Sequence, residues 1–278
     1  MKIAGGIVLY NPDIERLKEN IEAIRHQVDV LILADNHSKN IDAVRTLLSD
    51  IHLEDYELIC NPKNMGIAYA LNQITEYSCQ SGAGWTLFLD QDSVAPANMI
   101  EEYRKYLDHK DVVMLCPQIV DRNFAGSEPK QTEGGYKEVQ RCITSGSFVK
   151  NEVFGKVGPF NNKLFIDQVD FEFTARLVKA GYKMYRINKV VLLHELGNSR
   201  EVLLDGKKVV TTNHNPMRRY YAARNRVYCL KRYPKYTNYK TVIRYFINVP
   251  RLIFLYEEDK AAKIWAMVRG LFAGIFMR

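Results

Sequence analysis

The sequence lacks several features that would assign it to a familiar class of protein. Its five cysteines are odd in number and widely spaced, and no CxxC occurs, which excludes a disulfide framework and a zinc ribbon and favours a reducing compartment. No run of about 18 uninterrupted apolar residues is present, so no membrane-spanning helix is predicted. The short apolar start soon meets Asn11-Pro12 and lacks the pattern of a signal peptide.

Acidic residues are scarce in the last part of the chain. From Glu201 onward there are 16 Lys and Arg residues but only 5 Asp and Glu. Between Asn215 and Arg251, ten basic residues are interleaved with tyrosines and no acidic residue occurs. Such a stretch suits the phosphates of a nucleotide, a nucleic acid or anionic lipids. Pro216 begins a predicted basic helical tail over residues 216–278, broken near Pro234 and Pro250.

The first half alternates short apolar runs with helical stretches. This alternation predicts an α/β sandwich with a Rossmann-like, mostly parallel sheet flanked by helices. The strands expected here are 3–10, 30–34, 56–60 and 85–89, and the helices are about 14–27, 41–49 and 66–78. The second half predicts strands at 112–117, 143–149, 182–187 and 190–194, and a helix at about 168–180.

Polar residues follow each of the first four predicted strands. They are Tyr10-Asn11-Pro12, Asp35-Asn36, Asn61-Pro62-Lys63-Asn64 and Asp90-Gln91-Asp92. Because ligands bind at the carboxyl ends of parallel strands, we expect a ligand site at this edge of the sheet. No GxGxxG follows the first strand, which weighs against a dinucleotide.

The pair Asp90 and Asp92 predicts a divalent metal site. Two carboxylates two residues apart, in a turn after a buried strand, can approach one Mg²⁺ or Mn²⁺ whose other positions are filled by diphosphate oxygens and water. The alternative is a solvated surface turn. His194 ends an apolar strand, where it either completes the metal site, contacts a phosphate or is a satisfied core histidine.

Two further strand ends have a structural alternative beside the functional one. Asp35 can accept hydrogen bonds from a pyrimidine ring or a ribose hydroxyl, or it can cap the next helix. Asn64 and Gly66 begin a predicted helix, where a glycine allows close backbone approach to a ligand or forms a capping loop.

Three carboxylates cluster at the start of the helix expected at about 168–180. Asp170 lies between Val169 and Phe171, so partial burial would raise its pKa and suit a general base. We expect Asp167 to cap the helix and Glu172 to pair with Arg176 four residues on. Acidic residues are also favoured in a first helical turn by the helix dipole alone.

The residues Tyr10-Asn11-Pro12, Asp35-Asn36, Asn64-Met65-Gly66-Ile67-Ala68 and Leu89-Asp90-Gln91-Asp92-Ser93 occur in the order found in family 2 inverting glycosyltransferases of GT-A fold. The forms FIDQVDFEF, LLHELG and RRYYAARN resemble the bacterial rhamnosyltransferase branch of that family. The resemblance covers about residues 3–225. It implies transfer of L-rhamnose from dTDP-β-L-rhamnose to a lipid-linked saccharide in cell-surface polysaccharide synthesis.

The resemblance also implies roles for single residues. Asp35 binds the base of the nucleotide, Asp90 and Asp92 bind the metal and the diphosphate, and Asp170 is the catalytic base. The sites so predicted are the following: catalytic, Asp170; nucleotide-sugar-binding, Tyr10, Asp35, Asn64, Gly66, Asp90 and Arg224; metal-binding, Asp90, Asp92 and His194; acceptor-binding, Asp167. Val169 stands where the family has an acidic residue, which leaves Asp167 as the alternative base.

The resemblance divides the chain into a GT-A domain at 1–215 and a basic amphipathic helical tail at 216–278. The nucleotide-binding half of the first domain covers about 1–95 and the acceptor-binding half about 96–215. An apolar face over residues 264–276 predicts either core packing, a homodimer interface, or a peripheral helix on an anionic membrane surface. We favour the last, which places the protein in the cytoplasm on the inner face of the cell membrane.

Three other functions are kept as alternatives. A family 2 glycosyltransferase using another nucleotide sugar, such as a UDP-hexose, would share every motif. A nucleotidyltransferase would carry a Gly-rich basic loop after the first strand, where YNPDIERL stands instead. A nucleic-acid-binding module would use the Arg/Tyr-rich segment but leave the polar strand ends unexplained, so no nucleic-acid partner is expected.

Overall fold

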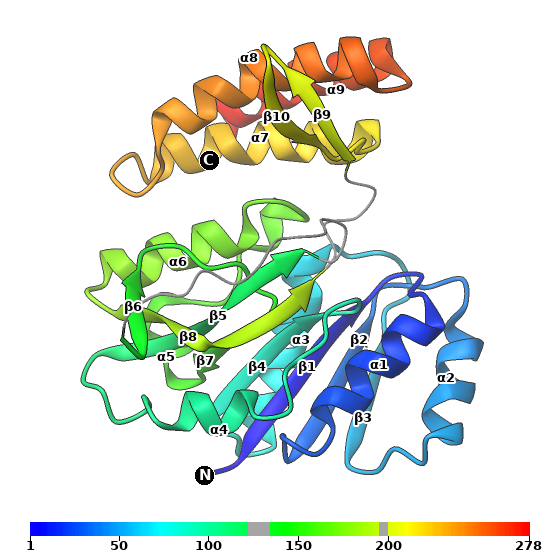
Figure 1. Cartoon of the computed structure of the whole chain (residues 1–278), viewed down its shortest axis with the longest axis vertical. Coiled ribbons are helices and arrows are strands. Elements are labelled where there is room, and N and C mark those ends of the chain that lie inside the picture. The colour runs from blue at the N-terminus through cyan, green and yellow to red at the C-terminus, as the bar shows by residue number, and fades with distance from the viewer. Residues whose placement is uncertain (122–133, 195–199) are drawn as a thin grey trace.

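The computed structural model describes residues 1–121, 134–194 and 200–278, apart from the side chains of Asp121 and His194. An eight-stranded sheet runs through the first 194 residues in the order β3-β2-β1-β4-β7-β5-β8-β6 (Figure 1). The pairs β1–β2, β2–β3, β1–β4 and β5–β8 are parallel, so the prediction of a mostly parallel α/β sheet is confirmed.

Strands of the large sheet alternate along the chain with the helices that flank it. The strands are β1 Ile3–Leu9, β2 Val30–Asp35, β3 Tyr56–Cys60, β4 Trp85–Asp90, β5 Val112–Asp121, β6 Tyr136–Val139, β7 Ser147–Lys150 and β8 Lys183–His194. The helices are α1 Ile14–Ile24, α2 Ile41–Asp50, α3 Ile67–Gln80, α4 Met99–Arg104, α5 Glu152–Val157 and α6 Val169–Lys179, with a short 3-10 helix at Asn162–Leu164.

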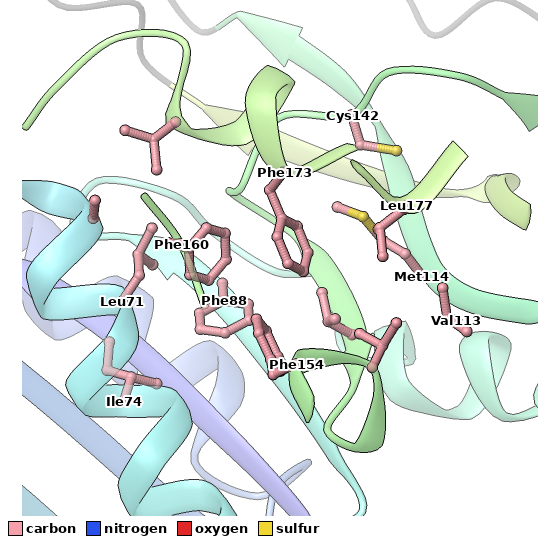
Figure 2. Close-up of a cluster of buried hydrophobic side chains, with 14 of the residues drawn as sticks. Leu71, Ile74, Phe88, Val113, Met114, Cys142, Phe154, Phe160, Phe173 and Leu177 are labelled. Carbon is pink, nitrogen blue, oxygen red and sulfur yellow. The ribbon is translucent and has the colours of Figure 1, made fainter. Parts of the chain in front are cut away.

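Each face of the sheet is covered by its own apolar core. Buried side chains of α1, α2 and α4 pack on one face. Those of α3, α5 and α6 pack on the other, where Phe88 of β4 meets Phe160 with ring centres 5.6 Å apart, and Phe154 stacks on Phe173 at 5.1 Å (Figure 2). The two covered faces leave the ends of the strands as the place for a ligand.

Gly6 explains the glycine pair in the first strand. A Cβ at this position would lie 2.2 Å from Cγ2 of Ile74, so α3 packs directly on the backbone of β1. The pair therefore serves packing in the strand, in agreement with the absence of a dinucleotide loop after it.

Two strand predictions in the second half needed correction. The expected strands at 182–187 and 190–194 form one strand, β8, because it pairs with β5 on both sides of a register shift between Cys116 and Gln118. The expected strand at 143–149 begins only at Ser147. The residues before it form a loop that reaches the end of β4, as described below.

The last part of the chain forms a helical extension at one end of the molecule (Figure 1). It contains a hairpin of β9 Arg200–Leu204 and β10 Lys207–Thr211, and the helices α7 Pro216–Arg232, α8 Tyr239–Tyr256 and α9 Lys260–Phe276. The predicted domain boundary at residue 215 assigns this hairpin to the first domain. In the structure the hairpin contacts α8, since Tyr256 Oη donates to the Leu203 carbonyl at 2.5 Å. No described helix has both the length and the hydropathy needed to cross a bilayer.

The predicted break near Pro234 is confirmed, but the one near Pro250 is wrong. Pro250 lies inside α8, whose neighbouring residues Leu252 and Ile253 are buried and hold the helix in place. The chain turns instead after Tyr256, where Asp259 adopts a left-handed φ of 50°. A proline removes one helical hydrogen bond, a cost that buried neighbours can offset.

A buried ion network and a close helix pair stabilise the extension. Glu257 is 3% exposed and accepts from Arg219 at 2.6 Å and from Lys263 at 3.1 Å. A Cβ at Gly270 or Gly274 would lie 2.3 or 2.5 Å from backbone oxygens of α7, so α9 contacts the backbone of α7 directly. Part of the predicted apolar face of α9, including Met267, is therefore buried within the extension.

Candidate functional site

The carboxyl ends of β1, β2 and β4 are joined by side chains into one edge. Gln91 Oε1 accepts from the Tyr10 amide at 2.8 Å, and Ser38 Oγ accepts from the Asn11 amide at 2.7 Å. The N-terminus, where β1 begins, lies at the far end of the sheet, so this edge faces the helical extension (Figure 1). The convergence of strand ends that the sequence predicts is therefore present, with the Tyr10 side chain 50% exposed at its rim.

Asp35 is buried at this edge with one oxygen available. Its Oδ2 accepts from the amides of His37 at 2.9 Å and Ser38 at 3.0 Å, whereas Oδ1 is buried and has no hydrogen-bond partner among the described residues. The helix-capping alternative is wrong, because the residue at the N-cap of α2 is Asn40. A buried acceptor without a partner costs free energy, which a donor group of a ligand would recover.

Asn64 and Gly66 shape the start of α3. Asn64 Oδ1 accepts from the Gly66 amide at 2.9 Å, and Gly66 has a φ of 87°. A Cβ at Gly66 would lie 2.6 Å from the ring of Phe165, so the glycine is required for packing against the loop before α6. This geometry accounts for the glycine through a contact within the protein, and the role of both residues in nucleotide binding stays a prediction.

The turn that carries Asp90 and Asp92 is fixed from three sides. Asn20 of α1 donates to the Asp90 carbonyl at 2.6 Å, and Ser145 Oγ accepts from the Asp90 amide at 3.2 Å. The end of β8 also reaches this turn, since the amide of Val94 donates to the Leu193 carbonyl at 2.9 Å. The backbone of His194 therefore lies beside the turn, while its side chain lies outside the described residues.

The described side chains of this turn include two that suit a hard divalent cation. Asp90 and Asp92 offer carboxylate oxygens, the ligand type that Mg²⁺ and Mn²⁺ prefer. Within residues 1–121, 134–194 and 200–278, no group of three or more His, Cys, Asp or Glu side chains gathers as a metal cluster. Among the described side chains, the two aspartates are thus the candidate ligands of a cation at this turn.

The loop before α6 is held in an unusual backbone conformation. Phe165, Asp167 and Gln168 have φ values of 61°, 64° and 65°, which non-glycine residues rarely adopt. Asn225 of α7 holds this loop by donating from Nδ2 to the carbonyls of Leu164, Ile166 and Asp167 at 2.7 to 2.9 Å. Strained loops that a neighbouring element holds in place are typical of functional sites.

Asp170 follows this loop in the first turn of α6, and its side chain is half-buried. Burial raises the pKa of its carboxyl to about 7, an effect that the Phe171 amide, donating to Oδ1 at 2.8 Å, opposes. The negative charges of Asp167 and Asp90 contribute to this rise, while Arg141 opposes it. Asp170 thus lies within electrostatic reach of the Asp90 turn, and its carboxyl can exchange a proton near neutral pH.

The other members of the acidic cluster have structural partners. Asp167 does not cap α6, because its Oδ2 accepts from Arg218 Nε at 3.4 Å and the N-cap residue is Gln168. The expected pair of Glu172 and Arg176 is confirmed, with the shortest N–O distance 2.9 Å. Glu172 also accepts from Tyr233 Oη at 2.8 Å, so this pair joins α6 to α7 and its following turn.

The arginines of α7 differ in what they contact. Arg224 donates to the carbonyls of Lys163 and Leu164 and lies 4.7 Å from the Tyr221 ring centre, so it supports the loop before α6. Its predicted contact with the nucleotide sugar stays a prediction. The sequence interpretation missed Arg141 near Asp170, because it lies on a loop between two short strands and belongs to no local motif.

An edge of polar strand ends with two neighbouring aspartates, and beside it a carboxyl of raised pKa, are features that suit a nucleotide-sugar-dependent transferase. The description "Glycosyl transferase family 2" applies to a family model that matches residues 6–161, more than half of the chain. The chain belongs to this family. It is also 30% identical over 240 residues to dTDP-rhamnosyl transferase RfbF of Shigella flexneri, an alignment covering 81% of this chain and 79% of that protein.

Solved structures of low sequence identity share the GT-A fold. TarS 1–349 of S. aureus in complex with UDP-GlcNAc has a TM-score of 0.60 at 12% identity, covering 98% of this chain and 81% of that one. The mannosyltransferase PcManGT of Pyrobaculum calidifontis in complex with GDP-Man and Mn²⁺ has a TM-score of 0.59 at 15% identity. The match covers 98% of this chain and 73% of that one. GalNAc-T7 in complex with UDP, GalNAc and Mn²⁺ has a TM-score of 0.59 at 14% identity. The match covers 81% of this chain and 47% of that chain.

Proposed function

We propose that this protein transfers L-rhamnose from dTDP-β-L-rhamnose to a hydroxyl of a lipid-linked saccharide during cell-surface polysaccharide synthesis, with inversion at the anomeric carbon. The donor assignment is supported by the likeness to dTDP-rhamnosyl transferase RfbF over most of both chains. The reaction type is carried by one observation, the Asp170 carboxyl with a pKa of about 7 within reach of the Asp90 turn. Family membership favours this function over a nucleotidyltransferase and a nucleic-acid-binding module.

In this mechanism the donor binds along the strand-end edge. The free Oδ1 of buried Asp35 accepts a hydrogen bond from the nucleoside, and Tyr10 lies at the exposed rim. Asp90 and Asp92, with His194, would hold Mg²⁺ or Mn²⁺, which when bound neutralises charge on the departing diphosphate. Asn64 and Gly66 form the adjoining backbone at the start of α3.

Asp170 acts on the acceptor. Its carboxylate removes the proton from the attacking hydroxyl, which displaces the diphosphate from the opposite face of the sugar in one step. A β-linked donor then gives an α-rhamnoside. Asp167, three residues before Asp170 and paired with Arg218, would contact the acceptor.

A donor screen tests the proposed substrate. We expect the protein, without acceptor, to hydrolyse dTDP-rhamnose slowly and to leave UDP-glucose and UDP-N-acetylglucosamine intact, as measured by release of the nucleoside diphosphate. An Asp35→Ala variant serves as a control, because it should weaken dTDP binding without changing which sugar is accepted. Hydrolysis of a UDP-sugar but not of dTDP-rhamnose would contradict the rhamnose assignment and indicate a UDP-hexose donor, while the family assignment would stand.

We further propose that the helical extension attaches the protein to an anionic membrane surface on the cytoplasmic side. The supporting observation is an apolar face with large exposed side chains on α8 and α9, where Phe254 is 70% and Phe276 79% exposed. The other members are Ile243, Ile247, Leu255, Trp265 and Phe272. Exposed basic residues such as Lys240 and Arg244 lie on α8, and each basic residue near an anionic surface contributes about 1 kcal/mol.

Vesicle binding tests this attachment. We expect co-sedimentation with phosphatidylglycerol vesicles at low salt, release at high salt and no binding to phosphatidylcholine vesicles. A Phe254→Ser plus Phe272→Ser variant should bind about tenfold or more weakly, since each ring loses its apolar contact with lipid. Point substitutions are preferable to truncation after Leu255, because α9 packs on the backbone of α7.

The control is Leu203→Ser, which alters an exposed apolar residue of the hairpin and not of α8 or α9. Unchanged vesicle binding of the double variant would contradict the attachment. If the wild type ignores vesicles and forms dimers that the double variant loses in analytical ultracentrifugation, the apolar face is the homodimer interface instead.

A further inference from the structure

The loop before α6 contains a tight turn centred on Phe165. The Ile166 amide donates to the Leu164 carbonyl at 2.7 Å, and Phe165 has a φ of 61° and a ψ of −64°. These values define the rarer form of the γ-turn, in which the central residue is strained. Asp167 and Gln168 also have positive φ values, of 64° and 65°. The loop therefore keeps this shape only while its neighbours hold it.

Asn225 of α7 holds this loop from the side of the helical extension. Its side chain is fully buried, and its Nδ2 donates to three backbone carbonyls, those of Leu164, Ile166 and Asp167, at 2.7, 2.8 and 2.9 Å. A buried carbonyl that loses its donor costs free energy, so this one side chain stabilises the loop at three places.

The opposite side of the loop is fixed to the edge of the sheet where the donor is proposed to bind. The Phe165 carbonyl accepts from the Ile67 amide, at the start of α3, at 2.7 Å. Asn36, which follows Asp35 in the chain, donates from Nδ2 to the Gly66 carbonyl at 3.1 Å. The loop is therefore held between α7 and the elements that surround Asp35.

This loop leads directly into the proposed catalytic base. Gln168 is the N-cap residue of α6, and Asp170 lies in the first turn of the same helix, two residues on. Because the loop and this turn are continuous, the backbone of residues 165–168 sets where the Asp170 carboxyl lies relative to the donor edge. A misplacement of about 1 Å at a reacting group can slow a reaction by about 10²-fold.

We propose that Asn225 is a positioning residue for Asp170, because it holds the loop of residues 165–168 against the donor edge and so places the carboxyl at the acceptor hydroxyl. In this role Asn225 contacts neither substrate, and it affects the rate of the chemical step but not donor binding. The inference rests on the proposed function, since it takes Asp170 as the base. It also gives α7 a part in catalysis that is separate from the proposed membrane attachment.

The experiment compares hydrolysis of dTDP-β-L-rhamnose by the full wild-type chain and by Asn225→Ser, with water as the acceptor. Release of dTDP gives kcat and KM, and calorimetric titration of dTDP counts the donor sites, so that kcat is expressed per dTDP site. We expect kcat to fall about tenfold or more, because a serine hydroxyl can donate to only one of the three carbonyls. The KM for the donor and the dTDP affinity should stay close to the wild-type values.

The matched control is Asn151→Ser. Asn151 is also a buried asparagine, and its Nδ2 donates to Ser78 Oγ at 2.8 Å and to the Ala83 carbonyl at 2.7 Å, near the start of β4 and away from the donor edge. We expect this variant to unfold at a lower temperature, as Asn225→Ser does, but to keep the wild-type kcat per dTDP site. If Asn225 had only a structural role, the two variants would have the same kcat per dTDP site.

A second variant tests the inference if Asn225→Ser does not fold. Tyr221 lies one turn earlier in α7, is half-buried, and stacks on the Phe165 ring with the ring centres 4.8 Å apart. Tyr221→Ala therefore removes another contact that α7 makes with the loop. We expect its kcat per dTDP site to fall about threefold or more with little change in KM, in keeping with the usual contribution of a stacked aromatic pair.

The results separate this inference from the proposed function. Wild-type kcat per dTDP site in Asn225→Ser, or in Tyr221→Ala where Asn225→Ser does not fold, would overturn the inference alone if Asp170→Asn is slow. A loss of dTDP affinity in Asn225→Ser as large as its loss of kcat would also overturn it, since the residue would then act on the donor. If Asp170→Asn hydrolyses the donor at the wild-type rate, the proposed base is wrong and this inference is overturned with it.

Discussion

An Asp170→Asn variant is expected to transfer sugar about 10² to 10⁴ times more slowly than the wild type, the usual contribution of a general base. Asparagine keeps the size of the side chain but cannot take the proton of the acceptor hydroxyl. The affinity for dTDP should stay nearly unchanged, because Asp170 acts on the acceptor. Steady-state transfer and calorimetric titration of dTDP together measure both effects.

Two controls accompany this prediction. Asp167→Asn should retain most of the activity, since that carboxylate pairs with Arg218, and an inactive Asp167→Asn beside an active Asp170→Asn would identify Asp167 as the base. The second control is the pH profile. Burial raises the pKa of Asp170 to about 7, so the active deprotonated form grows as pH rises through that value, and this acidic limb should be missing in Asp170→Asn.

Removal of the divalent cation is expected to have the second large effect. Asp90 and Asp92 are the described carboxylates at the end of β4, and a cation between them and a diphosphate contributes several kcal/mol. We therefore expect EDTA, or Asp92→Asn with Mg²⁺ or Mn²⁺ present, to weaken dTDP binding by roughly 10² or more. Isothermal titration of dTDP with and without each ion measures the change and ranks the two metals.

The control for charge alone is Asp50→Asn at the exposed end of α2, which should bind dTDP as the wild type does. Equal dTDP affinity with and without EDTA would remove the metal from the account. Weakened binding in EDTA that Asp92→Asn does not reproduce would place the cation elsewhere.

The first half of the fold was predictable because its information is local. Each strand of the nucleotide-binding half is a short apolar run bounded by turn residues, and each crossover helix has its own apolar stripe. The strand-end rule then predicts that Asp35 and Asp90 lie at one edge of the sheet. The free Oδ1 of Asp35 was not predictable, since it depends on the amides of His37 and Ser38 satisfying the other oxygen.

The second half was harder to predict because its contacts are distant in sequence. The continuous strand β8 exists through its pairing with β5, about 70 residues away. Arg141 reaches Asp170 from a loop with no local signal, and Asn225 holds a loop nearly 60 residues earlier in the chain. Pro250 was expected to end a helix by its own chemistry, but the burial of Leu252 and Ile253 overrides that preference.

The stereochemistry of the product tests the central claim most directly. The wild-type protein is incubated with dTDP-β-L-rhamnose, and the sugar first released to water is followed by proton NMR before mutarotation mixes the anomers. The account predicts α-L-rhamnose, because a single displacement assisted by Asp170 inverts the anomeric carbon. If β-L-rhamnose is the anomer released first, the anomeric carbon has undergone either two displacements or no displacement. That result would contradict the account.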